Sequence, residues 1–524
     1  MKRLTFYISL LLGITFDVLF WDKPQGISFL IFITLLLLFG YFLLRKMSVK
    51  GNKSGYLFLI PIVILSIFSF VRAEPFTAFL NRWLTITLIG ILSVGYRSGL
   101  WFQFGLIDHI SKAVDLFGHM VSVPWLRTKQ IAIFSEDNNQ QVKKKKFKPI
   151  LRGILITTPI VIIFSVLFAS ADLVFDASLQ KLLSHLNIPN LGEIFARIFV
   201  IFIITNAFLG LITFVVLHSK EKKLIGKEKP FISPFLGTIE TTIILSSVLL
   251  LFITFLIVQF KYFFFNHQAI LEMGFTYSEY ARKGFGELIA ISIFSLGLIL
   301  ILNTVTQKKN RNEKLIFSIL NIGLVICNLI VLVSSFMRLY LYESAYGFTR
   351  LRTYSHAFII WMGILLLTIA YLLWKRRSRL FTNISIICAL GFALSLNILN
   401  VDGFIVHQNI SRVHADSPLD SNYLASLSTD AVPALVKAYL AEDTSQSTRL
   451  DLGASVACYK TINENNLNDD QWQIFTTSKQ QANRYLLSIA TELEEYKIIE
   501  GEWELIIQDV AGNETICYRS DLPF

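Results

Sequence analysis

Connectors rich in Lys and Arg alternate with connectors poor in them along this 524-residue chain, and they separate about eleven apolar segments. The alternation is typical of polytopic membrane proteins, because cytoplasmic connectors keep their cations and translocated connectors lack them. We therefore expect an all-α polytopic membrane protein with about eleven transmembrane helices. The predicted spans cover residues 4–20, 27–44, 56–71, 82–100, 150–171, 194–217, 235–258, 284–302, 315–337, 357–374 and 383–399.

The charge of individual connectors predicts the orientation. Arg45 and Lys46 follow the second segment, Lys308 and Lys309 follow the eighth, and Lys375 follows the tenth. Assigning these connectors to the cytoplasm puts the N-terminus in the cytoplasm and the C-terminal region on the extracytoplasmic side.

The composition agrees with a chain surrounded by lipid. Hydrophobic residues make up 54% and charged residues 16% of the chain, against about 45–50% and about 25% in ordinary globular domains. A formal charge of +11 would suggest nucleic-acid binding in a soluble protein, but here the cations gather in the predicted cytoplasmic connectors. The lipid bilayer is therefore an expected partner, and nucleic acid is not.

No sequence motif indicates a catalytic residue, a cofactor or a metal. The chain has no Walker A loop, no HExxH, no GxSxG and no CxxC. We therefore assign no catalytic residue, no cofactor and no metal ligand from the sequence.

The sequence divides into five parts. Residues 1–100 form an N-terminal four-span region, 101–149 a cytoplasmic or interfacial loop, and 150–399 a seven-span core. Residues 400–440 are an extracytoplasmic polar segment packed on this core, and 441–524 a small α+β appendage outside the membrane. Helices are expected at 431–440, 446–463 and 469–496, followed by a hairpin of 502–509 and 514–519. Cys458 and Cys517 could form a disulfide there, because that side of the membrane is oxidising.

Three polar clusters are predicted to face outward, at residues 274–288, 338–355 and 397–433. Glu287 enters an apolar span, so we expect it to face a partner inside the bundle, with Arg338 as the first candidate. Two interpretations stay open: a cap held by Arg–carboxylate pairs, or a site for an anionic or polyhydroxylated ligand, since guanidinium groups bind carboxylate and phosphate bidentately. The candidate ligand-binding residues are Glu279, Arg282, Glu287, Arg338, Arg350, Arg352, Asp402, Arg412 and Asp430.

These clusters resemble a bacterial family of multi-span membrane proteins, the domain of unknown function 4173, which is related to number 4153. The matching patterns are Tyr-x-x-Tyr-Ala-Arg-x-Gly-Phe-x-Glu-Leu at 277–288, Tyr-x-x-Ala-Tyr-Gly-x-Thr-Arg-x-Arg at 342–352, and the polar stretch 400–433. The resemblance covers residues 235–440, and the earlier spans agree only in being apolar. It implies a multi-span fold in a bacterial cytoplasmic (inner) membrane and no activity that could be transferred.

The expected function is non-enzymatic: binding of an envelope protein or a small polar ligand at the extracytoplasmic face, in envelope signalling or assembly. One alternative is a secondary transporter of a small anionic or polar solute, with a polar path from Glu287 or Asn328 to Glu240. The other is a membrane-embedded transferase acting on envelope lipid or sugar, with Glu279 or Glu343 beside His356.

Overall fold

The structure is a computed structural model, and ten of the helices it describes are long and apolar enough to cross a membrane. It describes residues 2–24, 26–133, 191–219, 234–265, 285–375, 380–413, 419–465, 472–500 and 505–517, and scattered positions between 157 and 175. The chain forms two compact units. Unit 1 comprises residues 1–24, 31–50 and 113–220, and unit 2 comprises 25–30, 51–112 and 221–524.

Unit 1 is built around the pairing of α1 (Lys2–Phe20) with α9 (Leu191–Leu217), and it also holds most of α2 (Ser28–Lys46) and of α6 (Leu106–Ile133). An ion pair joins the first two helices: the guanidinium of Arg197 donates to both carboxylate oxygens of Asp17, at 2.7 Å for the shortest contact. The Asp17 side chain is 7% exposed. A charge buried in an apolar helix pair needs such a partner.

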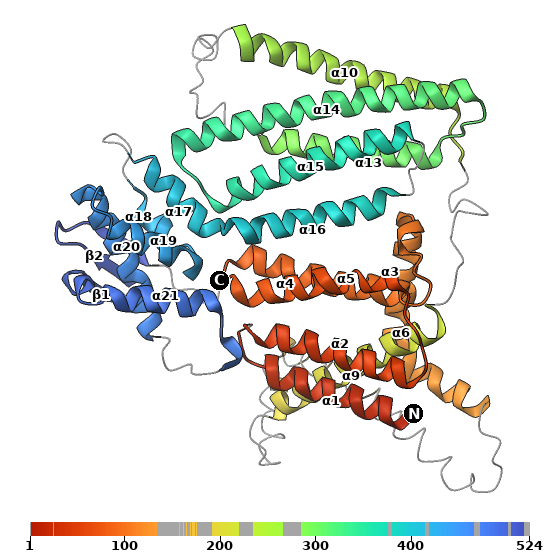
Figure 1. The fold of residues 1–524 in the computed structure, drawn as a ribbon, viewed down its shortest axis with the longest axis horizontal. Helices are drawn as coiled ribbons and strands as arrows, with labels where there is room; N and C mark the ends of the chain where they lie inside the picture. The colour runs from red at the N-terminus through yellow and green to blue at the C-terminus, as the bar shows by residue number, and fades with distance from the viewer. Residues whose placement is uncertain are drawn as a thin grey trace. The chain divides into compact units, whose positions relative to one another are not determined.

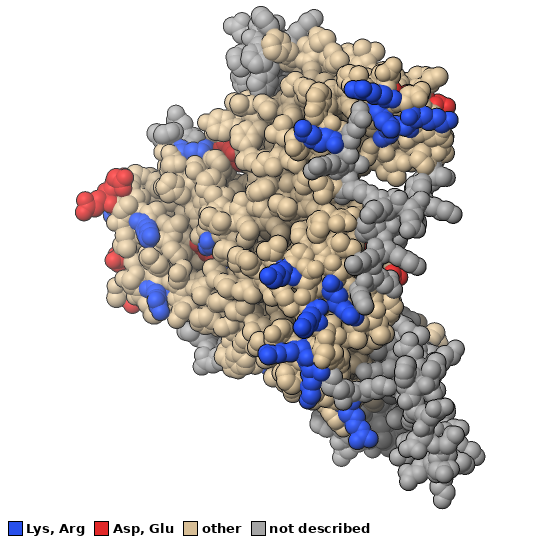
Figure 2. Space-filling model, turned by 45° about the vertical axis from the view of Figure 1, so that its right-hand side comes forward, with Lys and Arg blue, Asp and Glu red and all other residues tan. Residues whose placement is uncertain are grey.

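Unit 2 contains the other spans and the C-terminal region (residues 401–517). Its spanning helices are α4 (Leu59–Val71) preceded by the short α3 (Lys53–Tyr56), α5 (Pro75–Gly95), α10 (Thr238–Phe265), α13 (Phe285–Val305), α14 (Arg311–Tyr346), α15 (Arg350–Trp374) and α16 (Phe381–Leu399). Leu324, Val325 and Leu366 are fully buried where α14 meets its neighbours. Most of the surface visible in Figure 2 is uncharged, as expected for helices that face lipid.

The predicted polytopic helical fold is confirmed, and each of the ten spans corresponds to a predicted one. The remaining prediction, residues 150–171, lies largely outside the described residues. Helix boundaries differ for local reasons. The span predicted at 82–100 begins at Pro75, because the Glu74 carboxylate caps it by accepting from the Phe76 and Thr77 amides. Helix α14 begins at Arg311, where Glu313 accepts from the Asn310 amide.

The C-terminal region gathers at one end of the unit 2 helices (blue in Figure 1). Its described residues form five α-helices and a three-stranded antiparallel sheet in the order β1-β2-β3. The helices are α17 (Val401–Ser411), α18 (Ser421–Ala425), α19 (Val432–Tyr439), α20 (Gln446–Asn465) and α21 (Thr477–Ser488), and the strands are β1 (Lys497–Glu500), β2 (Leu505–Gln508) and β3 (Glu514–Cys517).

Two details of this region differ from the prediction. The helix expected at 469–496 is interrupted: two short 3-10 turns, Trp472–Ile474 and Glu492–Glu495, flank α21, and Thr476 caps its start by accepting from the Lys479 amide. Strand β1 was not predicted, because its sequence Lys-Ile-Ile-Glu is too short to show a period of two. It pairs with β2 from Lys497 opposite Gln508 to Glu500 opposite Leu505.

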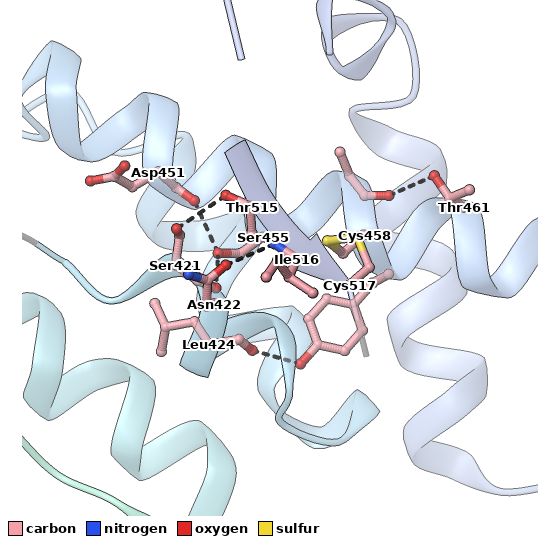
Figure 3. Close-up of a disulfide and its surroundings, with 12 residues drawn as sticks. Ser421, Asn422, Leu424, Asp451, Ser455, Cys458, Thr461, Thr515, Ile516 and Cys517 are labelled. Carbon is pink, nitrogen blue, oxygen red and sulfur yellow. Dashed lines mark hydrogen bonds between the residues drawn. A yellow bond between two sulfur atoms is a disulfide. The ribbon is translucent and has the colours of Figure 1, made fainter. Parts of the chain in front are cut away.

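Cys458 on α20 and Cys517 on β3 form a disulfide (Figure 3). Beside it, Asn422 on α18 accepts from the Ile516 amide at 2.7 Å, and the hydroxyls of Ser421 and Thr515 lie 3.1 Å apart. The last strand is thus held to residues on two helices that precede their partners by more than 50 positions, which closes the core of the C-terminal region.

We expect Cys458→Ala to lower the free energy of unfolding of the C-terminal region by about 2–4 kcal/mol, because the lost bridge closes a long loop with a sequence separation of 59. Thermal unfolding of the purified protein, followed with and without reductant, measures this loss. Cys388→Ala is the control, because Cys388 is a buried free thiol on α16. Equal stability of Cys458→Ala and the oxidised wild type would contradict the prediction.

Candidate functional site

Three connectors at one end of unit 2 meet the C-terminal region through a group of buried and half-buried polar residues, which we name the polar junction. The connectors are those between α4 and α5, between α14 and α15, and between α16 and α17. The polar junction comprises Arg72, Glu74, Arg350, Tyr354, Asp402, Tyr423 and Asp430.

The centre of the polar junction is a bidentate ion pair. Arg350, the first residue of α15, donates from Nε to Asp402 Oδ1 at 2.8 Å and from Nη2 to Asp402 Oδ2 at 2.6 Å. The Asp402 side chain is 0% exposed, and its Oδ2 also accepts from the Ser428 amide at 2.7 Å. Asp402 reaches this position because Asn400 takes a left-handed conformation, with φ 53°, that turns the chain from α16 directly into α17. The backbone N–H of Arg350 donates to Tyr423 Oη at 2.8 Å.

Two further carboxylates, those of Glu74 and Asp430, join the α4–α5 connector to the C-terminal region. Asp430 Oδ2 accepts from the amides of Ala73 and Glu74 at 2.8 and 3.1 Å, and its Oδ1 lies 4.0 Å from Arg72 Nη1. The capping carboxylate of Glu74 also accepts from the Tyr354 hydroxyl on α15 at 2.5 Å. Glu74 is 2% exposed and Asp430 is 5% exposed, so both acids depend on these donors.

The tight turn between α14 and α15 is held by three further polar side chains. Asn409 accepts from the Phe348 amide at 2.7 Å and donates to the Phe348 carbonyl at 3.0 Å. Arg412 donates to the Ser344 carbonyl at 2.8 Å, and Arg352 donates to the Gly347 carbonyl. Gly347 has φ 81°, a conformation that favours glycine. The C-terminal region thus fixes the entry into α15.

Burial raises the pKa of Asp430 and of Tyr423, the polar junction residues that follow α17. It raises the pKa of the Asp430 carboxyl above its ordinary value, while the Ser478 hydroxyl, the two amides and Arg72 oppose this rise. Burial also raises the pKa of Tyr423, whose phenol therefore stays protonated. Tyr423 therefore accepts from the Arg350 N–H as a neutral phenol. Each carboxylate of the polar junction accepts from at least two donors.

The predicted site residues separate into four groups. Arg350, Asp402 and Asp430 belong to the polar junction, and Arg352 and Arg412 lie in the turn beside it. Glu287 and Arg338 lie elsewhere, on α13 and α14. Glu279 and Arg282 lie outside the described residues.

The Glu287 side chain is exposed at the start of α13, and the ion pairs of the described residues do not include one between Glu287 and Arg338. The expected partner inside the bundle is therefore not seen for Glu287. Its position in the first turn of the helix lets its carboxylate reach the interface instead.

The residues of the predicted transport path are separated. Asn328 is fully buried and donates to Ser295 Oγ and, at 3.4 Å, to the Ser292 carbonyl on α13. Glu240, like Glu287, is exposed. Asn328 therefore acts as a polar contact between two helices, and the described residues do not connect it to either acid.

Glu343 and His356, which the sequence suggests as an acid and its partner, do meet between α14 and α15. His356 Nε2 lies 2.7 Å from Glu343 Oε2, and the imidazole packs against Phe336 with ring centroids 4.4 Å apart. The Glu343 side chain is 1% exposed, so a substrate could reach it only after a rearrangement. No group of three His, Cys, Asp or Glu residues that could hold a metal occurs in the described part of the chain.

A groove of about 580 Å³ runs beside the polar junction between α17 and α19. Its lining is mostly apolar and includes the exposed polar residues His407, Ser411 and Lys437 and the buried Asp430. The lining residues are Leu399, Asn400, Gly403, Phe404, His407, Ile410, Ser411, Asp430, Pro433, Ala434, Lys437 and Ala438.

Sequence reasoning missed Arg72, Glu74 and Tyr354. A usable signal was present, since an acidic residue directly before a proline, as in Glu74-Pro75, is typical of the start of a helix. That signal would have moved the start of the fourth span to Pro75 and placed Glu74 in the connector that meets Asp430.

Comparison with known families finds one family model that covers both the unit 2 spans and the polar junction. The family model described as Domain of unknown function (DUF4153) matches residues 59–438. The match starts at α4, well before the resemblance at residue 235, and it includes every residue of the polar junction. No curated protein and no solved structure is significantly similar to the chain. Because the matched stretch is more than half of the sequence, the chain belongs to the family of the domain of unknown function DUF4153.

Proposed function

We propose that this is a multi-pass protein of a bacterial cytoplasmic membrane that binds an envelope protein or a small polar ligand through its C-terminal region, and so serves envelope signalling or assembly. In this proposal the N-terminus lies in the cytoplasm and the C-terminal region outside it. Kinship with the 4173 family is part of the same proposal and rests on the motifs at 277–288 and 342–352.

The observation that carries the proposal is the bidentate Arg350–Asp402 pair. It connects the C-terminal region to the first residue of a membrane span, and Glu74 and Asp430 make an equivalent connection to α5. A binding event that displaces α17 or the segment around Ser428 would therefore move the ends of two spans. This coupling is what a receptor or an assembly factor requires.

The polar junction itself is a positioning element in this proposal. The carboxylates of Glu74, Asp402 and Asp430 accept from protein donors, so a ligand would have to displace internal hydrogen bonds to reach them. Of the two interpretations of the polar clusters, the geometry therefore favours the cap held by Arg–carboxylate pairs over a ligand site. In this proposal the partner binds to the surface of the C-terminal region.

Two observations support the orientation. Lys309 and Lys375 lie at the ends of unit 2 helices opposite to those that contact the C-terminal region, as expected for cytoplasmic connectors. The disulfide between Cys458 and Cys517 is typical of oxidising compartments.

One observation favours a second candidate, a transferase: Glu343 and His356 are within hydrogen-bond distance. We rank it below the binding role because both side chains are largely buried, at 1% and 16% exposed. Both proposals share the same topology and differ in whether Glu343 is needed for anything besides folding.

Cysteine labelling in intact cells tests the orientation. We expect Glu442→Cys, at an exposed position after α19, to react with a membrane-impermeant maleimide. We expect Lys309→Cys and Lys375→Cys, at exposed positions of Lys-rich connectors, to react only after permeabilisation. Labelling of Glu442→Cys only in permeabilised cells would overturn the proposed topology.

Removing one partner of the central pair tests the coupling. We expect Asp402→Ala to lower the free energy of unfolding by about 3–5 kcal/mol, because a largely buried guanidinium loses its counter-ion. The double variant Arg350→Leu with Asp402→Leu should recover part of this loss. Thermal unfolding and the rate of trypsin cleavage in the C-terminal region measure both effects.

The matched control is Asp443→Asn, which changes an exposed acid and should alter stability by less than about 0.5 kcal/mol. An Asp402→Ala protein as stable and as protease-resistant as Asp443→Asn would show that the pair does not hold the two parts together.

Glu343→Gln separates the binding role from the transferase. Wherever deletion of the gene gives a phenotype, we expect Glu343→Gln to restore it to nearly the wild-type level, because the amide still hydrogen-bonds His356. Membrane-extract immunoblots establish that the variant accumulates normally. Lost complementation at normal protein level would favour the transferase.

A further inference from the structure

We propose that the groove between α17 and α19 binds one acyl chain of an anionic phospholipid, with the phosphate of that lipid at Lys437 and His407. This inference rests on the proposed function, because it names the class of ligand that the C-terminal region would bind outside the cytoplasm. The lipid would come from the leaflet next to the C-terminal region.

The groove begins at the membrane boundary. Leu399 lines it and is also the last residue of the spanning helix α16. Ile398 and Leu399 are 73% and 40% exposed, so apolar surface continues from the span to the groove entrance. Leu440, directly after the last residue of α19, is 51% exposed and adds apolar surface at that end of the helix. A lipid in the bilayer can therefore enter the groove without leaving an apolar surface.

The lining suits a narrow hydrocarbon chain. Helix α17 contributes Gly403, Phe404, His407 and Ile410, which share one helix face by their spacing. Helix α19 contributes Pro433, Ala434 and Ala438 from its facing side. Small residues from both helices leave the space open, and Phe404 is held in place by Phe348, with ring centroids 5.7 Å apart.

The cation Lys437 and the hydrogen-bonding imidazole of His407 favour an anionic headgroup at the groove. Lys437 and His407 are exposed at its rim. Lys437 Nζ lies 5.9 Å from the centre of the Tyr485 ring, a weak contact that leaves its N–H groups available. The acid in the lining, Asp430, is 5% exposed and already accepts from two backbone amides. Lys437 thus attracts a phosphodiester, and the Asp430 carboxylate, which is buried and already hydrogen-bonded, repels it little.

The test uses the purified full chain in phosphatidylcholine nanodiscs that contain a small fraction of phosphatidylglycerol with a photoactivatable acyl chain. We expect cross-links on peptides of α17 and α19. Lys437→Glu should reduce this labelling about fivefold, the factor expected for one basic residue at an anionic surface. Lys497→Glu is the control, because Lys497 is an exposed lysine outside the groove.

A second variant keeps the charge and fills the groove. Ala434→Phe should reduce the labelling to a similar degree, and retention of the Cys458–Cys517 disulfide shows that it folds. Equal labelling of Lys437→Glu and Lys497→Glu would overturn the proposal, as would equal labelling by a phosphatidylcholine probe. Competition by inorganic phosphate as effective as that by the lipid would also overturn it, because the acyl chain would then contribute nothing. These readouts do not depend on orientation in the cell, which the labelling of Glu442→Cys decides separately.

Discussion

The fully buried carboxylate of Asp402 is the constraint around which the second unit is organised. A carboxylate out of water is strongly unfavourable unless donors surround it, and here Arg350 supplies two and the Ser428 amide a third. The two donating residues and Asp402 belong to three different parts of the chain. Satisfying one charge therefore fixes the start of α15, the start of α17 and the segment before α19 relative to one another.

Buried acids are also paired with donors at the α4–α5 connector and within unit 1. Asp430 collects the Ala73 and Glu74 amides, and Asp17 collects the guanidinium of Arg197. In each case a buried acid is matched by donors from another part of the chain, and one of the two partners lies near the end of a span. Since lipid supplies no driving force for apolar helices to associate, such polar contacts help to define which helices pair.

The sequence was sufficient to predict the spans, because a membrane-crossing helix requires about 20 apolar residues and any sequence window of that length detects it. It was insufficient for the ends of α5 and α14, where Glu74 and Glu313 extend the helices by capping. Arg350, Asp402 and Asp430 were recognised as candidates one at a time. Their partners were not, because contacts such as Asp430 with Ala73 join residues more than 350 positions apart.

The contacts of the polar junction imply that the C-terminal region and the unit 2 spans unfold together. Hydrogen–deuterium exchange of the wild-type protein in nanodiscs tests it most directly, at the amides of Glu74, Arg350 and Ser428 that donate within the polar junction. We expect these three amides to exchange as slowly as the buried centre of α20 and with the same dependence on denaturant. Fast exchange at the polar junction while α20 stays protected would show that the two parts are joined only by the connecting chain and unfold separately.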